Sequence, residues 1–232
     1  MKIHYRIKNN AIEIVRCYGT DDRIVLPEEI NGLPVVSAAP YAFSAHKDGE
    51  EDAEIWESED VISFGEERLL AGEEVQEIVF PDTMPDCASI KYMLSGTSRL
   101  KRLVLPADLG ENVAKVDGTQ AFSGCGYRGV IALPNTKFSV LHANGASHEL
   151  CRIKGLSFSP QSPFDGAAPQ LDISYSDIDG DGIRAILALL PDVSSAADGI
   201  TRTVSIVGAT GASDIGEETL ASVATKGWTV TR

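Results

Sequence analysis

One short pattern recurs along the first two-thirds of the chain: an apolar stretch that ends in proline, followed later by an aromatic residue or leucine beside a small residue. The prolines are Pro27, Pro81, Pro106 and Pro134, and the later residues are Phe43, Leu70, Leu94 and Phe122. The prolines are separated by 54, 25 and 28 residues, so the first interval holds two units. Self-similarity at this period predicts a repeat architecture of about five units, the second irregular and acidic.

Units of about 25 residues cannot bury their own apolar side chains, whereas stacked units share one continuous core. Alternate residues of each stretch are apolar, which predicts a β-strand with one face inward. The residues expected to face the core are Ile24, Leu26, Ile78, Phe80, Leu103, Leu105, Ile131 and Leu133. Proline ends each strand because it has no N–H to donate. The pattern therefore predicts a solenoid with a narrow parallel sheet.

The residues that alternate with this core set are expected to form an outer face of the sheet. They are Arg23, Val25, Glu77, Val79, Arg102, Val104, Val130 and Ala132. Such a face carries an apolar row beside a charged one, and contiguous exposed apolar surface is typical of an interface. The competing interpretation is that valine favours strands and that parallel sheets are commonly apolar on both faces.

Two further motifs accompany the proline-terminated strands: Ile-Asn-Gly-Leu-Pro-Val at 30–35 and Ala-Phe-Ser-Gly-Cys at 121–125. Together they resemble the BspA-like leucine-rich repeat family of bacterial and some protist proteins, over residues 12–155. The acidic stretch at 45–68 departs from the family pattern. The resemblance implies an α/β fold, a right-handed leucine-rich repeat solenoid with an irregular convex side, acting as a protein-interaction scaffold, often on a cell surface. It supplies no catalytic residues.

After the repeats the pattern changes, so we expect a first part at 1–156 and a second at 157–232. Residues 157–170 carry three prolines and indicate a loop. The expected elements are strands at 171–174, 203–207 and 228–231 and helices at 183–190 and 215–226. This order favours parallel pairing with right-handed crossovers. We expect helices here to replace the irregular convex side of the same solenoid; a separate small α/β domain is the alternative. Asp214 is the expected N-cap of the last helix, and Gly227 its left-handed C-terminal residue.

The most suggestive chemical motif is a run of alternating carboxylates, Asp177, Asp179 and Asp181. Alternating oxygen ligands followed by glycine are typical of a calcium loop. The twelfth position is Ala188, where such loops have a bidentate glutamate. The competing interpretation is that Asp181 caps a helix that begins at Gly182. These three aspartates are the metal candidates, and we expect no bound metal or cofactor.

The net charge of the chain limits which classes of partner it is expected to bind. The 232 residues have a formal net charge of −14, and residues 46–77 carry thirteen acidic against two basic residues, a balance of −11. This segment predicts a solvated loop, with a docking site for a basic partner as the alternative. Nucleic acid and anionic membranes bind through Lys and Arg, so neither is expected as a partner. Ile55 and Trp56 mark the expected strand of the irregular unit.

Catalytic motifs are missing from the sequence: it has no His-Glu-x-x-His, Gly-x-Ser-x-Gly or phosphate-binding loop. The four cysteines form no Cys-x-x-Cys and are expected to be structural free thiols. We expect no enzyme. The first residues lack the apolar core of a secretory leader, and no apolar run reaches membrane-spanning length. The expected location is the cytoplasm if Met1 is the native start, or the cell surface or exterior if a signal peptide was removed.

These observations predict a non-catalytic scaffold that binds a protein partner through the outer face. The alternatives are a calcium-dependent or carbohydrate-binding cell-surface module of the adhesin type, and a purely structural segment. A carbohydrate site would require exposed aromatic residues, and Trp56 and Trp228 stand at expected core or end positions.

Overall fold

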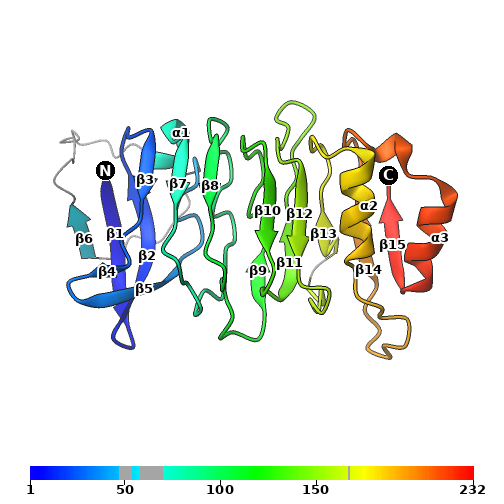
Figure 1. Cartoon of the computed structure of the whole chain (residues 1–232), viewed down its shortest axis with the longest axis horizontal. Coiled ribbons are helices and arrows are strands. Elements are labelled where there is room, and N and C mark those ends of the chain that lie inside the picture. Colours follow the sequence, from blue (N-terminus) through cyan, green and yellow to red (C-terminus); the bar gives the residue numbers. More distant parts are fainter. Residues whose placement is uncertain (47–53, 58–69, 167) are drawn as a thin grey trace.

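The computed structural model describes residues 1–46, 54–57, 70–166 and 168–232. Strands make up 31% and helices 12% of the structure. The elements follow one another along the long axis, with the N-terminus near one end and the C-terminus near the other (Figure 1). Within the described residues, no helix is both long and apolar enough to cross a bilayer.

The N-terminal end is a mixed five-stranded sheet in the order β4-β5-β2-β1-β6. Its strands are β1 (Lys2–Lys8), β2 (Ala11–Tyr18), β4 (Glu29–Ile30), β5 (Leu33–Ala38) and β6 (Glu54–Glu57). Strand β1 is antiparallel to β2 and β6, whereas β2 and β5 are parallel. Two-residue turns create the hairpins: Asn9 and Asn10 have φ of 52° and 59°, and Asn31 and Gly32 have φ of 54° and 78°. Asparagine and glycine tolerate this left-handed region, which two-residue hairpin turns require.

The other three sheets are parallel. One contains β3 (Arg23–Val25), β7 (Glu77–Val79) and β8 (Arg102–Val104), and another pairs β10 (Val130–Leu133) with β12 (Gly155–Phe158). The third has the order β15-β14-β13-β11-β9. Its strands are β9 (Val116–Gly118), β11 (Phe138–His142), β13 (Leu171–Asp172), β14 (Arg202–Ser205) and β15 (Trp228–Thr231).

The helices are short and mostly lie near the C-terminal end (Figure 1). They are α1 (Ala71–Glu74), α2 (Gly180–Ala188), the 3-10 helix η1 (Ala212–Asp214) and α3 (Glu217–Thr225). Helix α2 packs against β12, and α3 packs against β15. The buried side chains of α2 include Ile183, Ile186 and Leu187, which recur at helical spacing and place one apolar face on the core.

The predicted leucine-rich repeat solenoid is wrong, because the strands form several small sheets, one of them curled like a half-barrel. Two physical causes account for the difference. The asparagine turns make antiparallel hairpins where parallel units were expected. The strands of the C-terminal part pair with β11 and β9, two short strands that the sequence pattern did not reveal, and do not extend the sheet of β3, β7 and β8.

The prediction of which strand residues face the core is confirmed for most of them. Ile24, Ile78 and Ile131 are buried, whereas Leu103 and Leu105 of the same parity are only partly buried. One apolar cluster extends from the first residue of the chain to Trp228. This cluster includes residues on both sides of residue 157, and the division of the chain at that residue stays a prediction.

Details of the predicted loops and caps need correction. Asp179, not Asp181, caps α2, and Gly216, not Asp214, precedes α3. The left-handed conformation of Gly227 is confirmed, with φ of +85°. The expected loop at 157–170 begins inside β12, since that strand continues to Phe158. A strand covers Ile55 and Trp56, but it pairs antiparallel with β1, and β3 pairs directly with β7, so it does not stack between them as the strand of a second unit. Residues 47–53 and 58–69 of the acidic segment lie outside the described residues.

Successive turns approach one another so closely that one glycine has no room for a side chain. The N–H of Gly126 donates to the carbonyl of Thr97 at 3.0 Å. A Cβ at Gly126 would lie 2.0 Å from the backbone oxygen of Ser98. At Gly155, by contrast, a Cβ would meet the side chain of Val130, with Cγ2 at the ordinary distance of 3.4 Å.

We therefore expect Gly126→Ala to lower the free energy of unfolding by about 2 kcal/mol or more, since the turn backbone must move. Gly155→Ala, the matched control, should change it by less than about 1 kcal/mol. Urea denaturation followed by circular dichroism measures both. Equal losses in the two variants would contradict this account of the turn contact.

Candidate binding face and groove

The residues predicted for the outer face come together in two rows across β3, β7 and β8. Arg23 is opposite Glu77, which in turn is opposite Arg102. Two residues further along the same strands, Val25, Val79 and Val104 form the second row. Val130 and Ala132 lie on β10, in a separate sheet.

The charged row is one carboxylate between two guanidinium groups. Arg23 Nε lies 3.3 Å from Glu77 Oε1, and Arg102 Nη1 donates to the same oxygen. Partial burial alone would raise the pKa of Glu77, but the hydrogen bonds from Arg102 and Arg23 outweigh it and hold that pKa below its usual range. The row therefore carries one net positive charge at neutral pH, since two arginines flank one ionised glutamate.

The apolar row is unusually exposed for this molecule. Among the described residues, four large hydrophobic side chains are exposed: Val130 by 55%, Ile7 by 50%, Val25 by 43% and Val104 by 37%. Three of the four belong to the predicted outer face. Val79, between Val25 and Val104, is partly buried, so the row is continuous across the sheet.

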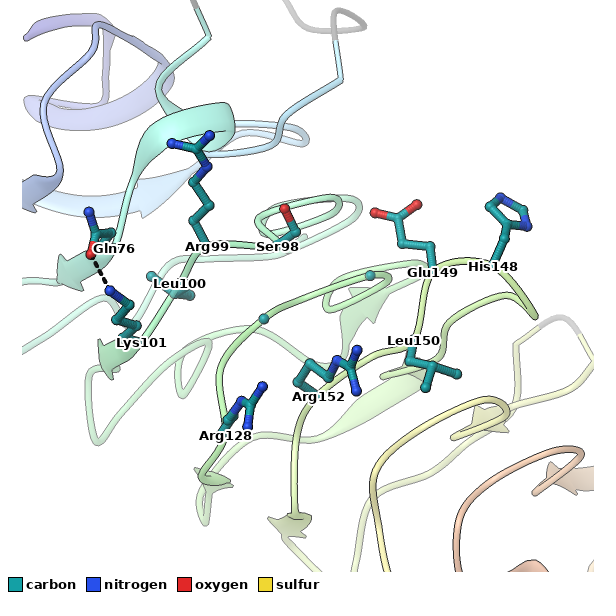
Figure 2. Close-up of a pocket in the computed structure, with 12 residues that line it drawn as sticks. Gln76, Ser98, Arg99, Leu100, Lys101, Arg128, His148, Glu149, Leu150 and Arg152 are labelled. Carbon is teal, nitrogen blue, oxygen red and sulfur yellow. Dashed lines mark hydrogen bonds between the residues drawn. The ribbon is translucent and has the colours of Figure 1, made fainter.

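A cavity of about 670 Å³ opens beside this face (Figure 2). Its polar lining includes Arg99, Lys101, Arg128, Arg152, His148 and Glu149. Lys101 immediately precedes β8, and Arg128 and Arg152 lie within three residues of the starts of β10 and β12. The cavity therefore lies at the amino-terminal ends of these strands.

The cavity lining is basic although the chain as a whole is acidic. Arg99 is paired with Glu74, and Lys101 Nζ donates to Gln76 Oε1 at 2.6 Å. Arg152 makes only a long contact, with Nη1 3.4 Å from Asp177 Oδ2. Figure 2 shows Arg128 beside this group, and no ion pair or hydrogen bond joins its side chain to any residue within the described ranges.

Sequence reasoning missed this groove, because its cations are spread from residue 99 to residue 152. A signal was present: a basic residue recurs shortly before successive strands, at Lys101, Arg128 and Arg152. Stacking of the units brings these equivalent positions together. A search for recurring charge at equivalent repeat positions, in addition to recurring apolar residues, would have found it.

The side chains of Asp177, Asp179 and Asp181 do not converge as the ligands of a metal site would. Asp177 Oδ2 lies 3.4 Å and 3.6 Å from the cationic groups of Arg152 and Lys154. Asp179 Oδ1 accepts a hydrogen bond from the N–H of Gly182 at 2.8 Å and so caps α2. In the part of the chain that the structure describes, no three acidic, histidine or cysteine side chains are grouped so that they could hold a metal ion.

Asp181 is the third member of the motif, and its side chain also points elsewhere. Asp181 Oδ1 pairs with Arg184 Nη2 at 2.5 Å, one helical turn further on. Asp177 therefore forms an ion pair beside the groove, Asp179 caps α2, and Asp181 forms an ion pair on the surface of the helix.

The cysteines offer no activated nucleophile. All four thiols are free and buried: Cys17, Cys87, Cys125 and Cys151. Burial raises the pKa of Cys87 to about 11 and raises the pKa of the other three thiols as well. Since the thiolate is the reactive form, these groups are poor nucleophiles in the folded protein.

Comparison of the chain with family models, curated proteins and solved structures finds no match.

The two interpretations of the aspartate motif predict different behaviour of Asp179 variants. If Asp179 is a helix cap, Asp179→Ala should lower the free energy of unfolding by about 1 kcal/mol, whereas Asp179→Asn should retain most of it, because asparagine caps nearly as well. Thermal unfolding with EDTA and with millimolar calcium measures both variants. A melting temperature that rises with calcium in the wild type, and in neither variant, would contradict the cap interpretation.

Proposed function

We propose that this chain is a non-catalytic protein-binding module whose contact surface is the outer face formed by β3, β7, β8 and β10. The observation that carries the proposal is the gathering of Val25, Val104 and Val130, three of the four exposed large hydrophobics among the described residues, on that face. Scattered exposed apolar residues need no explanation, but a contiguous group is typical of an interaction site.

The energetics of the face suit a protein partner. Burying one exposed valine side chain contributes about 1.5 kcal/mol, so three of them can supply the apolar centre of an interface. The neighbouring row of Arg23, Glu77 and Arg102 adds directional ion pairs and hydrogen bonds, which contribute to specificity and to the rate of association more than to affinity. An apolar centre beside charged groups is the usual arrangement of such interfaces.

The sequence resemblance to BspA-like proteins supports the same role, since that family consists of interaction scaffolds, although the single sheet expected from it is not formed. The calcium-dependent alternative has less support, because each aspartate of the motif has its own partner. A carbohydrate site would need open aromatic faces. Tyr41 and Tyr92 stack on each other with ring centroids 4.5 Å apart, and Trp228 is buried.

The proposal predicts which surface substitutions weaken partner binding. Charged side chains in place of the exposed valines of the outer face should be costly, so the double variant Val104→Asp with Val130→Asp should bind an identified partner at least about tenfold more weakly. The partner is first captured on the immobilised chain from an extract of the source cells and purified, and its affinity is then measured by calorimetry.

Ile7→Asp is the matched control, because Ile7 is equally exposed but lies on β1, outside the proposed face. It should leave the affinity unchanged, and circular dichroism should show that all variants fold. A partner that binds the double variant at full affinity, or that is lost equally with Ile7→Asp, would remove the proposed face from consideration.

A further inference from the structure

The residue two positions before a strand departs from the repeat pattern in one unit. Before β7, β8 and β12 this position is Val75, Leu100 and Ile153, and all three side chains are buried. Before β10 the equivalent residue is Arg128, whose side chain is exposed. A residue that breaks a pattern kept by its neighbours is expected at a functional site, since the core gains nothing from it.

The residue before Arg128 covers the core at this turn. Tyr127 is partly buried and packs against the apolar cluster. Its ring lies against Gly129, where a Cβ would stand 2.2 Å from the hydroxyl oxygen of Tyr127. Arg128 therefore has no packing role in the core, and its side chain lines the basic cavity instead (Figure 2).

Arg128 also differs from the other arginines in its pairing. Every other arginine within the described ranges has a carboxylate or a backbone carbonyl as partner. No residue in those ranges pairs with the side chain of Arg128. A guanidinium group donates in a planar fork that fits the oxygens of carboxylates and phosphates, so Arg128 is available to hold an anion.

Backbone hydrogen bonds fix the turns that carry the cations of the cavity. The N–H of Gly126 donates to the carbonyl of Thr97 at 3.0 Å. The N–H of Arg152 donates to the carbonyl of Cys125 at 2.7 Å. The cavity therefore lies on adjoining turns that are bonded directly to one another. Because these turns are held in place before a ligand arrives, less ordering is needed on binding.

The charges at the cavity do not cancel. Four cationic side chains line it: those of Arg99, Lys101, Arg128 and Arg152. Lys154 shares Asp177 with Arg152, Glu74 pairs with Arg99, and Glu149 also lines the cavity. Five cations thus stand against three carboxylates. Two positive charges remain without a counter-charge in this group, in a chain whose formal net charge is −14.

We propose that the basic cavity binds a phosphate monoester and that Arg128 is its principal ligand. This inference goes beyond the proposed function, because it does not depend on the outer face. A phosphate monoester carries close to two negative charges at neutral pH and has three strong acceptor oxygens. It therefore matches the two surplus charges and can accept from side chains on several turns.

Other anions fit the cavity less well. A single carboxylate compensates one charge and offers two oxygens. Nucleic acid carries one charge per phosphate along a continuous polyanion, which the acidic surface of the rest of the chain disfavours. The phosphate monoester has two sources with the same chemistry, a small soluble ester and a phosphorylated side chain of a protein, and the choice of probes separates them.

The probes are glycerol 1-phosphate and the tripeptide glycine–phosphoserine–glycine with blocked ends, titrated at pH 7.5 and followed by two-dimensional ¹H–¹⁵N NMR. At least one should cause saturable shifts at the N–H groups of Gly124, Gly126 and Arg128, which line the cavity. Malonate, a dianion whose charges lie on two separate carboxylates, should bind at least about tenfold more weakly.

Three single variants test the role of charge. Arg128→Gln should weaken binding of the ester at least about tenfold. Glu149→Gln removes the one carboxylate of the lining and should strengthen binding about two- to fivefold. Lys137→Gln is the matched control, because Lys137 is exposed and lies outside the cavity. It should bind the ester like the wild type, and circular dichroism should show that all three variants fold.

The proposal is overturned if neither ester causes saturable shifts, if malonate binds equally well, or if Arg128→Gln and Lys137→Gln bind the ester equally. Tighter binding of a single-stranded oligonucleotide without terminal phosphates would also overturn it. Equal affinity for the two esters would support the proposal with a small soluble ligand. At least about tenfold tighter binding of the tripeptide would support it with a phosphorylated side chain.

The proposed function is judged separately by the double variant at Val104 and Val130. This variant should bind the phosphate esters like the wild type, since both valines lie outside the cavity lining. Loss of a protein partner in the double variant with ester binding intact would support both conclusions. Ester binding that survives Arg128→Gln would remove the phosphate site alone.

Discussion

Backbone hydrogen bonds between equivalent positions of successive units are the interaction on which the rest of the structure depends. The N–H of Phe43 donates to Met93, that of Leu94 to Ala121 and that of Phe122 to His142, at 2.9–3.1 Å. Each turn thus satisfies the polar backbone of the turn before it, as buried backbone groups require. Because the bonds repeat, equivalent side chains stack, and one apolar core forms along the molecule.

The same regularity explains where the surface becomes distinctive. β7 and β8 begin 25 residues apart and pair in register, and β3 pairs in register with β7 across a longer interval, which aligns Arg23 with Glu77 and Arg102. Between β8 and β10 the spacing lengthens and the ladder stops. Stacked turns still bring Lys101, Arg128 and Arg152 together around the cavity, so a basic groove arises in an acidic chain.

Part of this arrangement could be predicted from the sequence, and part could not. The alternation of apolar residues identified the inward residues Ile24, Ile78 and Ile131 and, by subtraction, the exposed valines, because parity along a strand is a local property. The strands at Val116–Gly118 and Phe138–His142 escaped notice, since short strands with mixed composition have no periodic signal. The caps of α2 and α3 were misplaced for a related reason: several neighbouring residues could serve as a cap, and packing chose among them.

By itself, the sequence determined which residues of the proline-terminated strands face inward and the chain's excess of negative charge, because each depends on the composition or on residues close together in the chain. Only the tertiary structure decided that two asparagine turns make antiparallel hairpins, how the strands divide into separate sheets and which cations share one groove. Those features depend on the register between units and on small differences in unit length, and register is settled by the backbone bonds of the whole stack.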